Sequence, residues 1–508
     1  MSDQPSALIS PIPLENVPIL QLRARLKTEL SDGNRLGLLT AMSSPNGSQI
    51  ISLLVQTLSG GVRVLISQLP HDAASYASLT PDIPQAHWFE REINDMWGIR
   101  PLGHPRLKSL VIHDTYPDNL FPLAQQVSPA LMRKRNNRAA YRFSVVQGNG
   151  VYEVPVGPVH AGIIEPGHFR FSCLGEVIEN LEIRLGYVHR GVEERLTNCD
   201  WKAMRHVVEA ASSDTAAANA VAHAQAIESL AGVQAPPDIQ RLRSACVEIE
   251  RAACHIGDLG GICNDLGFGA GSAAFAVLRG TVLGIAEMIT GSRFMTGVIV
   301  PLSHRNMPAK PLCTAAANRL HECRKQLQST IPLLLQNSSA IERMEGMGVM
   351  KHSLAQDFGL VGPAGRASGI DYDVRKVFRL PEYDCMEWQT PNLYDGDVLA
   401  RAKVRATEAT TALDLASVML ASVTPVSAPE SVVELPADSA GVGIVEAWRG
   451  ELIHLILTNS DGVVARYKIK DPSFNNWTAL AVAARGNLLS DFPLCNKSFG
   501  LSYSGTDL

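Results

Sequence analysis

The spacing of hydrophobic residues changes along the chain, from short apolar runs to a period of three to four. Near the N-terminus, residues 49–57 (QIISLLVQT) and 61–67 (GVRVLIS) are apolar runs joined through Gly60, which predicts two strands in a hairpin. Residues 87–97 (HWFEREINDMW) place apolar side chains at helical spacing and stop before Gly98, which predicts a helix. The N-terminal part is therefore expected to be a small α+β module.

The longer remainder of the chain is expected to be mainly helical. Short β segments are predicted at residues 151–156 and 169–173. Apolar residues then recur every three or four positions, which predicts long helices over residues 200–230, 238–266 and 272–291. The tail, residues 441–508, returns to alternating apolar and polar positions, which predicts strands.

These patterns divide the chain into three parts and give an α+β fold class. Residues 1–125 form the expected small module, and residues 126–150 a linker. Residues 151–508 form a mainly helical body with short β segments near its start and at the C-terminus. The polar and basic stretch 128–150 has an alternative interpretation, as a basic surface strip that touches a partner.

Composition excludes several classes of protein. The 508 residues contain 45 Lys and Arg against 50 Asp and Glu, which argues against nucleic acid as a partner. With 46% hydrophobic and 19% charged residues, the chain is globular rather than disordered. The apolar stretch 274–302 is interrupted by Arg279, Glu287 and Arg293, so we expect a buried helix rather than a membrane span. The N-terminus lacks a secretory pattern, and we expect a cytoplasmic protein.

The cysteines argue against a metal or redox motif. There are nine, and no two form a C-x-x-C pair. This pattern disfavours a zinc ribbon, a ferredoxin-type cluster and a dithiol redox site. Scattered thiols in a cytosolic protein are usually reduced and buried, which is the interpretation favoured here.

One short motif carries a resemblance to a known family. Residues 90–99 (EREINDMWGI), followed by residues 103–107 (GHPRL), resemble the signature of the C-type subunit family of complex I, E-R-E-x-x-D with an aromatic residue and glycine and then H-P-x-L. The resemblance implies a C-type α+β domain over residues 1–125. It implies a structural helix end at the motif and no catalysis there.

Eight further blocks in the body resemble a second family. They are residues 157–160 (GPVH), 165–171 (EPGHFRF), 189–193 (HRGVE), 248–251 (EIER), 362–369 (GPAGRASG), 373–375 (DVR), 394–397 (YDGD) and 446–451 (EAWRGE). Together they are similar to the D-type subunit of complex I and to the catalytic large subunit of membrane-bound nickel–iron hydrogenases, which share one fold. Fusion of the C-like and D-like parts in one chain resembles energy-converting hydrogenases of the hydrogenase-4 and formate hydrogenlyase type.

The chain departs from the hydrogenases at the metal ligands. Their large subunits hold nickel and iron with two C-x-x-C pairs, and soft thiolates suit these metals. The corresponding positions here are Ser212 and Thr215, and Ser502 and Gly505. A hydroxyl or a glycine cannot replace a thiolate, so we expect this chain to bind no metal.

The resemblance to complex I implies that the emptied cavity receives a quinone headgroup. The family places a histidine on the first β loop, for which His160 and His168 are the candidates, as proton donors to the headgroup. The facing tyrosine of the family falls near Ser213 and is missing. The alternative is that both histidines are loop residues bonded to backbone carbonyls.

The loop is expected to lie against two other segments and form a polar pocket. Ser212, Ser213 and Thr215 would line it from one side, and Ser502 and Gly505 from the other.

Two charged residues are expected at the border of this pocket. Glu193 is the candidate proton relay, and Arg366 resembles the arginine that faces the metal in hydrogenases. For Glu193 the alternative is a structural ion pair, with Arg190, that joins two elements. For Arg366 two roles stay open, a binder of an anion or carbonyl in the emptied cavity and a structural clamp.

The resemblance implies one function and leaves a second open. The first is an electron- and proton-transfer subunit of a respiratory complex, peripheral on the inner face of the cell membrane, with no cofactor of its own. Its expected partners are an iron–sulfur small subunit similar to the B-type subunit of complex I, a membrane subunit similar to the H-type subunit, and ion-translocating membrane subunits. Quinone and NAD(H) are the candidate substrates of the complex. The second function is a catalytically silent scaffold that couples a redox module to an ion-translocating partner.

Overall fold

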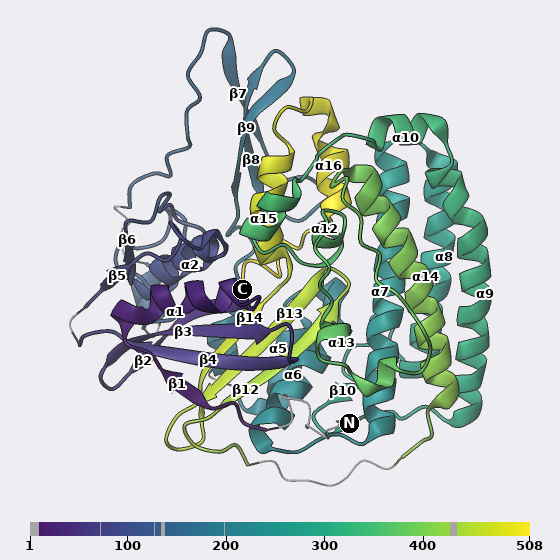
Figure 1. Cartoon of the computed structure of the whole chain (residues 1–508), viewed down its shortest axis with the longest axis horizontal. Helices are drawn as coiled ribbons and strands as arrows, with labels where there is room; N and C mark the ends of the chain where they lie inside the picture. Colours follow the sequence, from purple (N-terminus) through teal and green to yellow (C-terminus); the bar gives the residue numbers. More distant parts are fainter. Residues whose placement is uncertain (1–9, 72, 126, 134–137, 198, 427–433) are drawn as a thin grey trace.

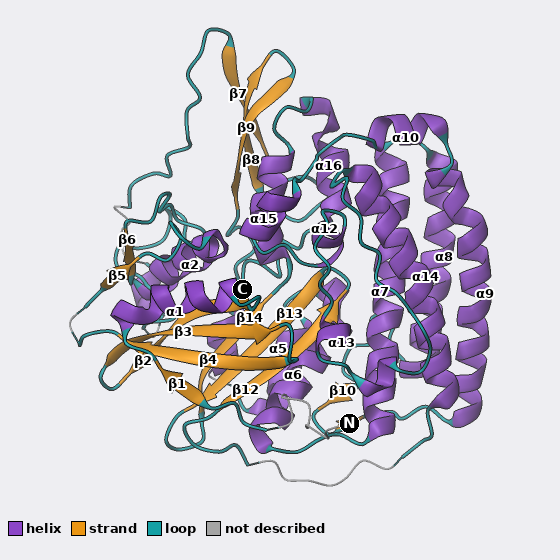
Figure 2. Cartoon of the chain, in the orientation of Figure 1, coloured by secondary structure: helices purple, strands orange, loops and turns teal. Residues whose placement is uncertain are grey.

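The computed structural model describes residues 10–71, 73–125, 127–133, 138–197, 199–426 and 434–508. It confirms the α+β fold class, with several small sheets beside a large helical bundle (Figures 1 and 2). Residues 126 and 134–137 of the expected linker lie outside the described residues.

A four-stranded sheet forms the N-terminal part. Its order is β1-β4-β3-β2, in which β1 runs parallel to β4 and the other pairs are antiparallel. The hairpin expected from the apolar runs is β3 and β4. The strands are β1 (Leu14–Asn16), β2 (Arg35–Ser44), β3 (Gly47–Gln56) and β4 (Gly61–Gln68), and helix α1 (Ile19–Ser31) precedes β2. A two-stranded parallel sheet, β5 (Ser75–Ala77) with β6 (Arg100–Leu102), flanks this module.

Helix α2 spans His87–Trp97, as the sequence predicts, and ends at Gly98 in the left-handed conformation. Its acidic side chains hold surrounding loops. The buried Glu90 accepts hydrogen bonds from Ser78, Thr80 and the N–H of Leu79. Buried acceptors that satisfy several donors fix loop geometry, so this part of the motif has a structural role.

A second sheet begins the body of the chain. Strands β7 (Val151–Val156), β8 (His168–Leu174) and β9 (Val177–Arg184) form an antiparallel meander that stands out from the rest of the molecule in Figure 1. Its middle strand, β8, carries His168 at its first position.

Long helices pack side by side to form the helical bundle. Helix α7 contacts both α8 and α14, and α9 contacts α8 and α14 (Figure 1). These helices are α7 (Pro237–Asp265), α8 (Gly269–Thr290), α9 (Lys310–Leu335) and α14 (Val398–Ser422). Shorter elements connect them: the strand pair β10 (Ile299–Val300) and β11 (Ser303–His304), then α10 (Ser338–Met344), α11 (His352–Asp357), α12 (Gly362–Arg366) and α13 (Val374–Val377). Helix α3 (Pro129–Met132) lies before β7.

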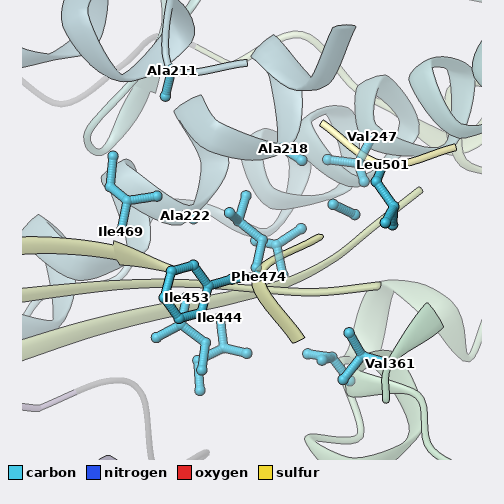
Figure 3. Close-up of a cluster of buried hydrophobic side chains, with 14 of the residues drawn as sticks. Ala211, Ala218, Ala222, Val247, Val361, Ile444, Ile453, Ile469, Phe474 and Leu501 are labelled. Carbon is cyan, nitrogen blue, oxygen red and sulfur yellow. The ribbon is translucent and has the colours of Figure 1, made fainter. Parts of the chain in front are cut away.

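One part of the continuous hydrophobic core lies between helix α6 (Ala216–Ala231) and a third sheet, β12 (Ala440–Ala447), β13 (Gly450–Thr458) and β14 (Val464–Lys470). Figure 3 shows alanines of α6 facing isoleucines of these strands. The contact is close because Gly443 of β12 has no side chain: a Cβ there would lie 1.9 Å from the carbonyl oxygen of Ala222. Small residues on both elements therefore let two backbones approach.

The structure corrects three expectations. Residues 200–230 are not one helix, because α5 (Trp201–Glu209) ends before a turn and α6 starts only at Ala216. The tail contains α15 (Ser473–Ala483) and α16 (Phe492–Phe499) after its strands. Helix α8 ends at Thr290, short of residue 302, and is only partly buried; its length and apolar composition are those that both membrane spans and core helices have.

The approach of α6 and β12 gives a prediction about stability. Gly443→Ala is expected to destabilise the protein by about 2 kcal/mol or more, because the new methyl group collides with backbone that cannot rotate away. Gly280→Ala on α8 is the matched control, since a Cβ there meets nothing within 4 Å, and alanine stabilises a helix by about 0.5–1 kcal/mol over glycine. Thermal unfolding of both variants checks this. Equal melting temperatures would show that α6 and β12 separate easily.

Candidate functional site

The two segments expected at the site meet in a directed chain of hydrogen bonds. Ser502 Oγ accepts the N–H of Gly505 at 2.9 Å and lies 3.0 Å from Ser212 Oγ. Ser212 Oγ in turn donates to Asp214 Oδ1 at 2.9 Å. Because Ser212 gives its proton to the carboxylate, Ser502 is the donor between the two hydroxyls. Both serines are buried, so this seam between the turn before α6 and the C-terminal segment is closed.

Asp214 is the charge at the centre of this seam. Arg449, which follows β12, donates through Nη1 to Oδ1 at 2.8 Å and through Nη2 to Oδ2 at 2.7 Å. Thr215 Oγ1 adds a third bond to Oδ1, and Trp448 Nε1 donates to the carbonyl of Asp214. Desolvation opposes ionisation, but the charge and hydrogen bonds of Arg449 outweigh it and hold the pKa of Asp214 below its usual value.

A cavity of about 440 Å³ opens beside Asp214. Trp448, Cys254 and Asp258 line it together with Arg279 and Arg293, and glycines of α7 and α8 complete the wall.

Its carboxylates and its arginines differ in how they are paired. Asp258 is paired with Arg405 at 3.0 Å, as Asp214 is with Arg449. Arg279 and Arg293 have neither an ion pair nor a side-chain hydrogen bond among the described residues. The cavity therefore carries net positive charge.

The β loop reaches the C-terminal segment through a carboxylate. Glu165 Oε2 accepts the backbone N–H groups of Tyr503 and Ser504 at 3.1 and 3.3 Å. The loop histidines bond within the loop instead: His160 Nε2 to the carbonyl of Gly167 at 2.7 Å, and His168 Nδ1 to the carbonyl of Gly157 at 3.3 Å. Burial lowers the pKa of His168, so its imidazole is mainly neutral near pH 7.

Glu193 lies in a buried cluster of charges away from the cavity beside Asp214. Its oxygens accept hydrogen bonds from Arg466 Nη2 at 2.6 Å and from the N–H of Ile469, and Lys468 lies 2.9 Å away. Desolvation opposes its charge, but Arg466 and Lys468 outweigh this and keep the pKa of Glu193 below its usual value. Glu193 does not line the cavity beside Asp214.

Arg366 also lies among carboxylates rather than in the cavity. It donates through Nε to Glu408 at 2.7 Å and through Nη1 to Glu446 at 2.8 Å, and it is 1% exposed. These carboxylates overcome the effect of burial and raise the pKa of Arg366 above its usual value. The geometry is that of a clamp between α12, α14 and β12.

Ser213, Thr215 and Gly505 lie at the turn but differ in environment. Ser213 is exposed, whereas Thr215 is buried under Trp448 and Arg449. At Gly505 a Cβ would lie 2.5 Å from Asp471 Oδ2 and 2.9 Å from Ser502 Oγ. This position therefore has no room for any side chain unless Asp471 moves.

The arginine and aspartate at the centre of the site were missed from the sequence. Arg449 lies within residues 446–451 and Asp214 within residues 212–215, both of which were singled out for other residues. The signal that could have found Arg449 is its place beside Trp448 in a block shared with the hydrogenase family. A charged residue next to an aromatic one in a buried strand end needs a partner.

A nickel–iron centre does not fit this donor set. Ser212 and Ser502 use their oxygens on each other and on Asp214, Thr215 Oγ1 is bonded to Trp448 and Arg449, and Gly505 offers no side chain. Neutral hydroxyls are weak ligands for metals that select thiolates. No group of three or more His, Cys, Asp or Glu in ligand geometry occurs in the described part of the chain.

Comparison with known proteins identifies the family. Residues 18–130 match the family described as respiratory-chain NADH dehydrogenase, 30 Kd subunit, and residues 265–434 and 428–507 match the 49 Kd subunit family. Formate hydrogenlyase subunit 5 of Escherichia coli (strain K12) is 32% identical over 438 residues, covering 85% of this chain and 77% of that protein. The chain belongs to the complex I-related family of energy-converting hydrogenase subunits.

Other members of this energy-converting hydrogenase and complex I family align over most of the chain. Hydrogenase-4 component G of E. coli is 28% identical over 86% of this chain and 76% of its own length. The C/D subunit of NADH-quinone oxidoreductase from Phocaeicola vulgatus is 25% identical over 80% of this chain and 82% of its own length. A chain of the archaeal membrane-bound sulfane sulfur reductase has the same fold, with a TM-score of 0.65 and 23% identity over 71% of this chain and 99% of its own.

The start of α6 gives a prediction about pH. Glu250 of α7 accepts the N–H groups of Ala217 and Ala218 at 2.7 and 3.2 Å, and burial raises its pKa to about 8. The folded state then binds a proton that the unfolded state loses above about pH 4.3. Wild-type stability is therefore expected to fall, relative to Glu250→Gln, as pH rises from about 4.3 to about 8, and to level off above that. Parallel melting curves of the two proteins across this range would contradict it.

Proposed function

We propose that this chain is the large subunit of a respiratory oxidoreductase complex on the cytoplasmic face of the cell membrane, where it passes electrons and protons to a quinone without a nickel–iron centre. Electrons reach it from an iron–sulfur cluster in a small subunit similar to the B-type subunit of complex I. A membrane subunit similar to the H-type subunit and ion-translocating subunits complete the complex, with NAD(H) as the candidate electron donor. Its relatives are named as components of formate hydrogenlyase, hydrogenase-4 and NADH-quinone oxidoreductase.

The cavity beside Asp214 is the observation that carries this proposal. It adjoins the seam of Ser212 and Ser502, which corresponds to the metal position of the hydrogenases, and its volume of about 440 Å³ is in the range of small-molecule sites. Arg279 and Arg293 supply donors for the two carbonyl oxygens of a headgroup, and Trp448 supplies an aromatic wall.

The loop histidines have a separate part in the proposal. His160 and His168 face the carbonyls of their own loop, and a headgroup that displaces one of those bonds gains a proton donor. Glu165 keeps the loop against Tyr503 and Ser504, so His160 stays near the C-terminal segment.

Quinone turnover by the purified complex tests the acceptor site. Arg279→Gln is expected to raise KM for quinone about tenfold, since a lost charged hydrogen bond is worth about 1.5–3 kcal/mol. Arg305→Gln, an exposed arginine outside the cavity, is the matched control and keeps the wild-type KM. His160→Ala is expected to lower kcat if the loop supplies the proton. Unchanged KM and kcat in the Arg279 and His160 variants would refute the acceptor site.

Elemental analysis provides a second prediction. The purified complex is expected to contain iron from its iron–sulfur partner and no stoichiometric nickel, because none of the four ligand positions has a thiolate. The iron serves as the internal control for metal retention during purification. One nickel per chain would show that residues other than Ser212, Thr215, Ser502 and Gly505 form a metal site.

A catalytically silent scaffold is the second candidate. It is favoured because the residues expected to act at the site already have partners within the chain. Glu193 and Arg366 each lie in buried ion pairs, and both histidines are bonded to loop carbonyls. A scaffold predicts that the same variants lower assembly of the complex while KM for quinone stays unchanged in whatever complex forms.

A further inference from the structure

A second polar cavity lies where three parts of the chain meet. None of its lining residues belongs to the cavity beside Asp214. Its volume is about 230 Å³, room for about eight waters at the volume each takes in the liquid. It is lined from the segment after β6 by Ser109 and Asp114, from residues 138–141 by Arg138 and Tyr141, and from the end of β9 by Arg184. The cavity therefore joins the N-terminal module, the segment before β7 and the β7–β9 sheet.

Arg184 is the unusual residue of this cavity. It is 5% exposed, and its Nη1 has no hydrogen-bond partner among the described residues. No carboxylate of the described chain lies within ion-pair distance of its guanidinium, which instead stacks over the ring of Tyr141 at 4.0 Å and bonds the hydroxyl of Tyr187. A buried cation without a carboxylate partner is costly, and an anion in the cavity that this guanidinium lines supplies the missing counter-charge.

The neighbouring acid at Glu182 is not available to Arg184. It already accepts hydrogen bonds from Lys108 at 2.7 Å, Tyr141 at 2.6 Å and the N–H of Ser144 at 2.8 Å, with Arg106 at 3.0 Å. Desolvation opposes its charge, but these donors outweigh it and lower the pKa of Glu182 to about 2.

The other groups around the cavity leave it electropositive. Arg138 holds the carbonyls of Pro117 and Leu120 and adds a positive charge at the wall. His113 donates through Nε2 to the carbonyl of Leu185, and burial lowers its pKa, so it is neutral near pH 7. Asp114 supplies a negative charge against the two arginines.

We propose that this cavity binds a small oxyanion of the phosphate type, held by the guanidinium of Arg184 with the hydroxyl of Ser109 as a second donor. Guanidinium groups match the geometry of phosphate oxygens, and charge-assisted bonds of this kind are the strong ones in proteins. The bound anion joins β9 to the segments before it. Free phosphate and a lipid phosphate headgroup share this chemistry.

Thermal unfolding of the purified protein, in its complex, tests the site with sodium phosphate titrated against sodium chloride at constant ionic strength. Phosphate is expected to raise the melting temperature of the wild type and of Arg142→Gln, an exposed arginine of the same segment outside the cavity. Arg184→Gln is expected to weaken the apparent phosphate affinity tenfold or more, on the order of one lost charged hydrogen bond. Arg184→Lys keeps the charge but loses the planar, two-pronged donor geometry of the guanidinium. Its apparent phosphate affinity is expected to lie between those of the wild type and Arg184→Gln.

Two further arms make the result decisive. Vesicles of phosphatidylcholine with and without phosphatidic acid separate the sources: preferential binding by the wild type over Arg184→Gln assigns the site to a lipid phosphate, and its absence assigns it to free phosphate. Should Arg184→Gln fail to fold, Ser109→Ala and Arg184→Lys carry the comparison. The proposal would be overturned if phosphate did not specifically stabilise the wild type, or if the Arg184 variants responded equally. Arg184 would then be held by its contacts with Tyr141 and Tyr187.

Discussion

The two-pronged ion pair between Arg449 and Asp214 is the interaction on which the site depends. It connects the hairpin of β12 and β13 to the turn before α6, two parts of the chain separated by 235 positions. The ion pair also sets the direction of the other hydrogen bonds of the turn, because Asp214 Oδ1 accepts the hydroxyl protons of Ser212 and Thr215. Without the charge of Arg449, the carboxylate of Asp214 would keep only hydroxyl donors and its exposure to the cavity, and the turn would lose its charged link to the hairpin.

The hairpin of β12 and β13 also takes part in a larger network of buried ion pairs. Arg366 joins Glu408 to Glu446, and Arg251 donates to Glu248 and to the carbonyl groups of Glu446 and Ala447. Arg375 closes the set against Glu248 and Asp373. Loss of one member leaves another buried charge unpaired, which is why such a network specifies one arrangement of helices α7, α12 and α14 around β12.

The sequence predicted elements whose signal is local and missed features that depend on distant contacts. Helix α2 and strand β7 have the predicted bounds, since amphipathic spacing and Gly98 are visible in a short window. The break at 210–215 was missed because the alanines around it pack equally well in one helix or two. Arg449 and Arg184 were missed for a related reason: their importance follows from which partner is present or missing, and no local pattern reports that. The two loop histidines were found as candidates, but the carbonyls that hold them are set by the loop conformation.

Replacement of thiolates by hydroxyls changes what the seam can do, and the hydrogen-bond directions show how. A thiolate pair holds a metal because its lone pairs are free and charged. Here the protons run in one direction, from the N–H of Gly505 to Ser502, from Ser502 to Ser212, and from Ser212 to Asp214, so each oxygen that could face a metal is already an acceptor for its neighbour. The single negative charge of the seam is neutralised by Arg449. The acceptor site proposed above therefore lies in the adjoining cavity rather than in the seam, since Arg279 and Arg293 have no charged partner in the described chain.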